Sequence, residues 1–136
     1  MLHSQLSHPL NYTLAVLLLV LTPACSRDEG PRPVAEKFLE ALEARDYSTA
    51  AGYGTRETVK LLRQLEKIDA LNGDSVTAPK KIIIVSEDIQ GKTAIVYFRE
   101  EGEEYDQRIT LKKVEDGEKA EWKVAMQKEE IRKVSE

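Results

Sequence analysis

The sequence predicts an α+β domain in which three N-terminal helices pack on one face of a four-stranded antiparallel meander sheet. Apolar residues recur every three or four positions before Pro79 and every second position after it. The gaps between the strand-like segments are short and rich in turn-forming residues, and such gaps join only antiparallel neighbours. Helices and strands each carry one apolar face, so each layer can cover the other.

The first half of the domain has the pattern of three helices. The first begins with Pro33 in its opening turn, and its apolar stripe consists of Val34, Ala35, Phe38, Leu39 and Leu42. Asp46 is placed to cap a short helix over residues 48–51. Thr55 is placed to cap a third helix over residues 56–70.

The second half has the pattern of four strands, over residues 81–89, 93–99, 105–114 and 120–126. Alternation places one apolar set on a single face of the sheet: Ala94, Val96, Phe98, Ile109, Leu111, Trp122, Val124 and Met126. Polar residues such as Arg108 and Lys123 alternate with them on the other face. A sheet with one apolar face needs a cover, which the helical stripes supply.

The composition of the chain argues against several classes of function. The 136 residues include 20 Lys and Arg against 24 Asp and Glu, so the net charge is −4. A chain of this length is expected to form one domain, and its acidic balance argues against nucleic-acid binding. Both histidines and the only cysteine lie within the first 25 residues. The domain that follows has neither imidazole nor thiol, so we expect no metal site, no cofactor and no nucleophilic triad.

The N-terminal segment has the pattern of an export signal. Residues 13–21 are nine consecutive residues without charge, mostly Leu and Val, whereas a membrane span needs about 20. Pro23 and the small Ala24 follow, which is typical of a cleavage region. Cys25 comes directly after Ala24, and the segment resembles the lipobox of bacterial lipoproteins. That resemblance implies a signal peptide over 1–24 and attachment to a membrane through lipid on Cys25.

Thr22 stands where the lipoprotein pattern prefers Leu, so an ordinary secretory signal is the alternative. Ser26 after the cysteine resembles the sorting pattern of outer-membrane lipoproteins, which implies a location at the outer membrane, facing the periplasm. Residues 25–32 then read as the lipidated cysteine and a solvated tether, 33–129 as the domain and 130–136 as a polar tail.

Four segments carry a family resemblance: Val34–Ala51, Ser86–Val96, Ile109–Gly117 and Trp122–Val124. Their order and spacing resemble a bacterial lipoprotein family of unknown function in the nuclear transport factor 2-like superfamily, also described as cystatin-like or lumazine-binding-like. The resemblance implies a curved four-stranded sheet wrapped around the helices, often with a cone-shaped pocket between them. Members of the superfamily include isomerases, dehydratases, ligand carriers and scaffolds, so the fold leaves the function open.

Two functions follow from these residues. The first is a non-catalytic module that binds a small amphipathic ligand or an envelope protein, with self-association into a dimer as a further option. Its candidate pocket-lining residues are Tyr47, Tyr53, Phe98 and Trp122. The alternative is a pocket enzyme, isomerase- or dehydratase-like, using acid–base chemistry of Asp46 with Tyr47, Tyr53, Tyr97 or Tyr105. The missing imidazole and thiol favour the first.

Overall fold

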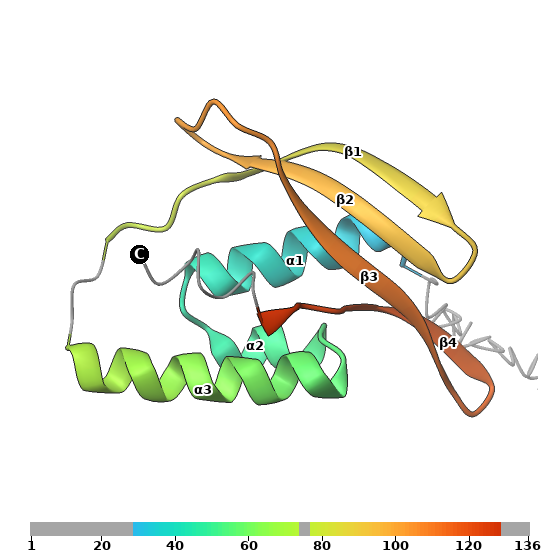
Figure 1. Ribbon diagram of the computed structural model, residues 1–136, viewed down its shortest axis with the longest axis horizontal. Helices are drawn as coiled ribbons and strands as arrows, with labels where there is room; N and C mark the ends of the chain where they lie inside the picture. The colour runs from blue at the N-terminus through green and yellow to red at the C-terminus, as the bar shows by residue number, and fades with distance from the viewer. Residues whose placement is uncertain (1–28, 74–76, 129–136) are drawn as a thin grey trace, which may run out of the picture.

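Three helices precede four strands in the computed structural model, which describes residues 29–73 and 77–128 (Figure 1). The elements are α1 (Pro31–Glu43), α2 (Tyr47–Gly52), α3 (Arg56–Asn72), β1 (Ile82–Gln90), β2 (Thr93–Glu100), β3 (Gln107–Asp116) and β4 (Lys119–Val124). The order and the layers confirm the predicted α+β class. The predicted signal peptide, Cys25 and the tail over 130–136 lie outside the described residues.

The sheet is an antiparallel meander in the order β1-β2-β3-β4, as predicted. Every residue assigned to its apolar face by alternation is buried, from Ala94 on β2 to Met126 just beyond β4. The residues of the core that these strands form with the helices all lie between Val34 and Met126. Residues 34–126 therefore contain a core of their own.

Helix α1 covers the sheet and contacts all four strands. Its buried side chains include Val34, Phe38 and Leu39, which belong to the predicted stripe. The helix begins at Pro31, so residues 31 and 32, which were expected to belong to the tether, are helical. The physical reason is that a first-turn residue needs no N–H donor, and proline already has a helical φ angle.

The other two helices begin at the predicted caps. Asp46 accepts a hydrogen bond from the Thr49 N–H at 3.1 Å, and Thr55 Oγ1 accepts one from the Thr58 N–H at 3.3 Å. However, α2 packs mainly against α1, and α3 packs mainly against α2. The expectation that all three helices cover the sheet is corrected in this respect, since α1 provides most of the cover.

The β4 edge of the sheet is closed at its C-terminal end, at Val124, by the segment between α2 and α3. The Val124 N–H donates to the Tyr53 carbonyl at 2.8 Å, and the Thr55 N–H donates to the Val124 carbonyl at 2.8 Å. The buried Thr58 hydroxyl donates to the same Val124 carbonyl at 2.8 Å and accepts from the Met126 N–H at 2.9 Å. These bonds occupy backbone groups that an edge strand would otherwise leave unpaired.

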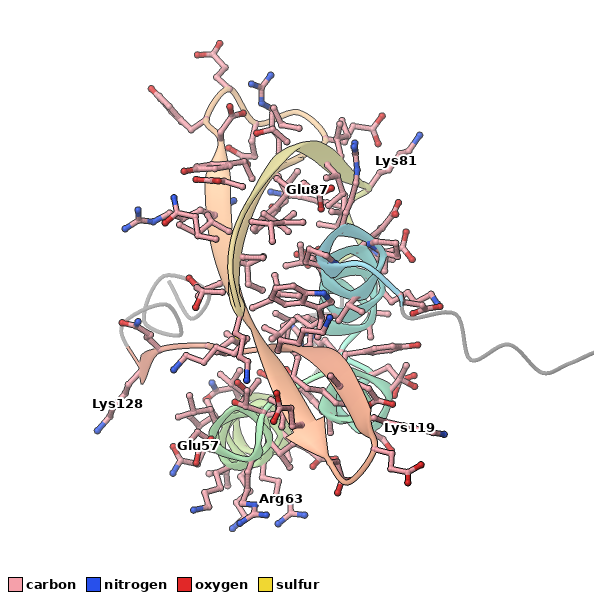
Figure 2. The ribbon with its side chains drawn as sticks, turned by 90° about the vertical axis from the view of Figure 1, so that its right-hand side faces the viewer. Glu57, Arg63, Lys81, Glu87, Lys119 and Lys128 are labelled. Atoms are coloured by element: carbon pink, nitrogen blue, oxygen red, sulfur yellow. The ribbon has the colours of Figure 1, made fainter. Side chains whose placement is uncertain are left out.

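The other edge, along β1, contains a bulge. Ile84 lies opposite Phe98 on β2 and Ser86 lies opposite Tyr97, which leaves Val85 as the extra residue. Before the bulge, even-numbered residues share the core face of the sheet, and Ile82 is buried there. After the bulge, odd-numbered residues lie on that face. Figure 2 shows β1 arching over α1.

Candidate functional site

A hollow of about 690 Å³ lies beside β4. Figure 1 shows that the start of α1 and the turn from β3 into β4, which both line it, lie at the same end of the domain. It is lined by Glu29, Val34, Gly52, Tyr53, Glu118, Lys119, Ala120, Glu121, Trp122 and Lys123. Three segments that are far apart in sequence therefore meet here: the start of α1, the end of α2 and the β3–β4 hairpin.

The apolar part of the hollow comes from Val34, Ala120 and Trp122. Ala120 and Trp122 lie two residues apart on β4, so they share the face of the sheet that points toward α1. Trp122 is 7% exposed, and the Lys113 ammonium lies 5.7 Å from the centroid of its ring. The Trp122 ring therefore packs against the core, lies close to the Lys113 ammonium and borders the hollow.

The rim of the hollow carries both signs of charge, from three carboxylates and two lysines. Lys123 Nζ donates to the Gly52 carbonyl at 2.8 Å and lies 3.2 Å from a Glu121 carboxylate oxygen, which joins β4 to the end of α2. Glu29 is paired with Lys37 of α1 at 2.5 Å. Because the two signs nearly balance, the rim suits a neutral or zwitterionic polar group better than a strong anion.

The predicted pocket residues are divided between the hollow and other places. Tyr53 and Trp122 line the hollow, whereas Phe98 is 6% exposed and belongs to the core under β2. Tyr47 lies at the contact between α2 and α3, where its hydroxyl donates to the Asp69 carboxylate. Sequence reasoning found the aromatic part of the hollow because alternation put Trp122 on the inner face of the sheet.

Sequence reasoning missed the polar rim. Glu118 and Lys119 follow an Asp-Gly turn signal and could have been placed at a hairpin tip from that signal alone. Glu29 and Gly52 approach this tip only through the packing of α1 and α2 against the sheet. No local pattern in the sequence reveals such a contact.

Tyr47 and Asp69 form a polar cluster with Arg45, whose Nε lies 3.8 Å from the same carboxylate. Burial raises the pKa of Tyr47 to about 12, and the hydrogen bond to Asp69 adds to the effect. Arg45 has φ +54°, a left-handed conformation that ends α1. A phenol with this pKa stays protonated at neutral pH, so here Tyr47 is a hydrogen-bond donor that joins α2 to α3.

Of the residues of the acid–base alternative, only Asp46 and Tyr53 line a common hollow among the described residues, an open one of about 380 Å³ beside α1 and α2. Both oxygens of the Asp46 carboxylate are bound by Thr49, and these hydrogen bonds hold the pKa of Asp46 below its usual value. Tyr97 alternates with the buried Val96 and Phe98, which puts it on the outer face of the sheet. Tyr105 is 77% exposed in the β2–β3 connection.

No family model, curated protein or solved structure matches the chain. Within residues 29–73 and 77–128, no helix has both the length and the apolar character needed to cross a bilayer. The same part of the chain holds no group of three or more His, Cys, Asp or Glu side chains placed to bind a metal ion. The geometry of the hollow therefore provides the main basis for a functional proposal.

Proposed function

We propose that this chain is a cell-envelope lipoprotein, anchored through lipid on Cys25, whose domain binds a small amphipathic ligand in the hollow without turning it over. One observation carries the proposal. The hollow measures about 690 Å³, has an apolar floor at Trp122 and has a charge-balanced rim. Binding sites for small molecules fall in the range of about 300–1,000 Å³ and combine an apolar lining with a few polar groups.

The position of the hollow supports a membrane source for the ligand. Glu29 lines the hollow and follows Cys25 by four residues, a length of chain that spans at most about 14 Å. Lipid on Cys25 would thus keep the hollow within reach of a membrane surface. The proposal includes a nuclear transport factor 2-like fold, which the arch of β1 over α1 supports (Figure 2).

Trp122 is the only tryptophan, so its fluorescence reports on the hollow directly. We expect monoacylglycerols and long-chain alcohols to shift its emission saturably when they are added to residues 26–136. High salt should change the affinity little, because the rim carries nearly balanced charge. No shift with any of these compounds, or formation of a product from one of them, would contradict the proposal.

A matched pair of variants tests the location. Ala120→Phe fills the floor of the hollow and should abolish the emission shift, whereas Ala70→Phe adds the same ring to the exposed side of α3 and should leave it intact. Chemical denaturation of both variants separates a blocked site from a damaged fold. Equal affinity in the two variants would place the ligand elsewhere.

The anchor is tested separately in cells. Labelled fatty acid should enter the wild-type chain and should be absent from Cys25→Ala, which should also keep its leader. A Cys25→Ala chain that is still labelled and processed would refute the anchor and leave the binding proposal standing.

A further inference from the structure

The outer edge of β1 is an exposed edge of the sheet. Within residues 29–73 and 77–128, no strand pairs with it. The Ile84 carbonyl on this edge accepts a hydrogen bond from the Arg32 guanidinium at 3.3 Å. Ile83 and Val85 are 45% and 44% exposed along the strand. A long apolar edge of this kind is a template for another strand.

The bulge restricts the registers in which this edge can pair with a second copy of itself. Opposing residues in an antiparallel pair must lie on the same face of the sheet. Even-numbered residues face the core before Val85 and odd-numbered residues face it after Val85. Two copies of β1 therefore match when each even-numbered residue lies opposite an odd-numbered one. The register centred between Ile84 and Val85 meets this condition in both halves of the strand.

The charges favour the same register. Its opposing pairs are Lys81 with Asp88, Ile82 with Glu87 and Ile83 with Ser86. Lys81 and Asp88 both lie on the outer face, so the twofold axis creates two identical ion pairs at the two ends of the contact. In Figure 2, Lys81 points away from the body of the molecule and Glu87 lies under the arch, as these faces require.

We propose that the partner of this edge is a second copy of the chain, paired antiparallel through β1 into one continuous eight-stranded sheet. A shift of two residues in one direction would place Asp88 opposite Ile83, which loses the ion pairs. A shift in the other direction would place Lys80 opposite Glu87, but Lys80 is already bound to Glu100 and Glu103. It would also place Ile83 opposite Ile84, which lie on different faces of the sheet. A parallel arrangement would place Lys81 of one copy beside Lys81 of the other. The faces and the charges together thus favour one register, whereas an unpatterned apolar edge would allow several.

Charge reversal tests this dimer in residues 26–136, which include the complete core. Sedimentation equilibrium should show a dimer for the wild type. Lys81→Glu and Asp88→Lys should each weaken it about tenfold or more, because two attractive pairs become repulsive. The variant with both changes should recover the wild-type affinity. Lys60→Glu, which makes the same charge change on the exposed side of α3, should have no effect.

Cysteine trapping tests the register itself, since residues 26–136 contain no cysteine. Ile83→Cys combined with Ser86→Cys should form an interchain disulfide on mild oxidation. Ile83→Cys combined with Gln90→Cys should form little, because those positions are not opposed and both ion pairs are kept. A wild type that is monomeric at every concentration would overturn the proposal. A dimer that neither charge variant weakens, or that the double variant fails to restore, would overturn it equally.

Discussion

The two edges of the same sheet are treated in opposite ways. The β4 edge is closed within the chain at its C-terminal end, because the segment from Tyr53 to Thr55 bonds Val124 on both its N–H and its carbonyl. The β1 edge carries a bulge and one side-chain contact, from Arg32 to Ile84. This difference separates two roles of the sheet. Strand β4 contributes to the core and to one wall of the hollow, whereas the edge of β1 is available for association with a partner.

The largest expected loss of folding stability comes from a substitution on β4. Trp122→Ala should lower the free energy of unfolding by about 3–5 kcal/mol, because it removes a large aromatic side chain that is 7% exposed. On the open edge, Ile83→Ala should cost about 1 kcal/mol, since Ile83 is already 45% exposed. Chemical denaturation measures both. Similar costs at the two sites would remove the contrast between the edges.

The next effect concerns the hydrogen bonds that close β4. Thr58→Val keeps the shape of the side chain but removes the donor to Val124 and the acceptor for the Met126 N–H. We expect a loss of about 2–3 kcal/mol, because a buried N–H is left without a partner. Thr58→Ser keeps the hydroxyl and should lose less. If the serine variant is the less stable of the two, packing and not hydrogen bonding holds this edge.

Much of the fold was predictable because period-2 patterns are local. The alternation of β2, β3 and β4 assigned each inner side chain to the correct face of the sheet, including Trp122. The same reasoning fails on β1, where residues 82–85 are all apolar and show no alternation. The bulge at Val85 changes the phase of that strand, and only pairing with β2 reveals it.

The candidate site was less predictable because it depends on contacts between distant segments. Tyr47 was an attractive pocket residue on composition alone, but Asp69 lies near it on α3 and binds its hydroxyl. Phe98 follows the same alternation as Trp122, yet it lies farther along the sheet from the hairpin and is covered by the core. The sequence pattern identifies the inner face of the sheet, but not which part of that face is left open.

Gly54 tests how tightly the segment between α2 and α3 is packed against the C-terminal end of β4. A Cβ at this position would lie 2.8 Å from Thr58 Cγ2 and 3.1 Å from Thr58 Cβ. The Thr58 hydroxyl cannot move away freely, because it is hydrogen-bonded to Val124, Met126 and Thr55. Gly54→Ala should therefore cost about 1–2 kcal/mol. Gly52→Ala meets no atom within 4 Å and should be neutral or slightly stabilising. If the two substitutions cost the same, the segment is less tightly held than its hydrogen bonds imply.

Tyr47 provides a contact that belongs to neither edge. Its pKa is about 12 in the folded chain against an ordinary value of 10.0, so the protonated form is favoured by folding. The stability that this contributes is fully present below about pH 10 and is lost as the pH rises toward 12. An absorbance titration should show one tyrosine ionising late, and Tyr47→Phe should remove that step. The loss of a different step would assign the high pKa to another tyrosine.

The smallest expected effect on folding lies at the open edge, where association and stability should separate. Lys81 is exposed, so Lys81→Glu should change the free energy of unfolding of the dilute monomer by less than about 0.5 kcal/mol. Lys80→Glu should cost more than Lys81→Glu, because Lys80 pairs with Glu100 at 3.2 Å and with Glu103 at 2.9 Å. Denaturation at low protein concentration gives both values. A large loss for Lys81→Glu in the monomer would mean that Lys81 supports the fold itself, and β1 would then be an ordinary structural edge like β4.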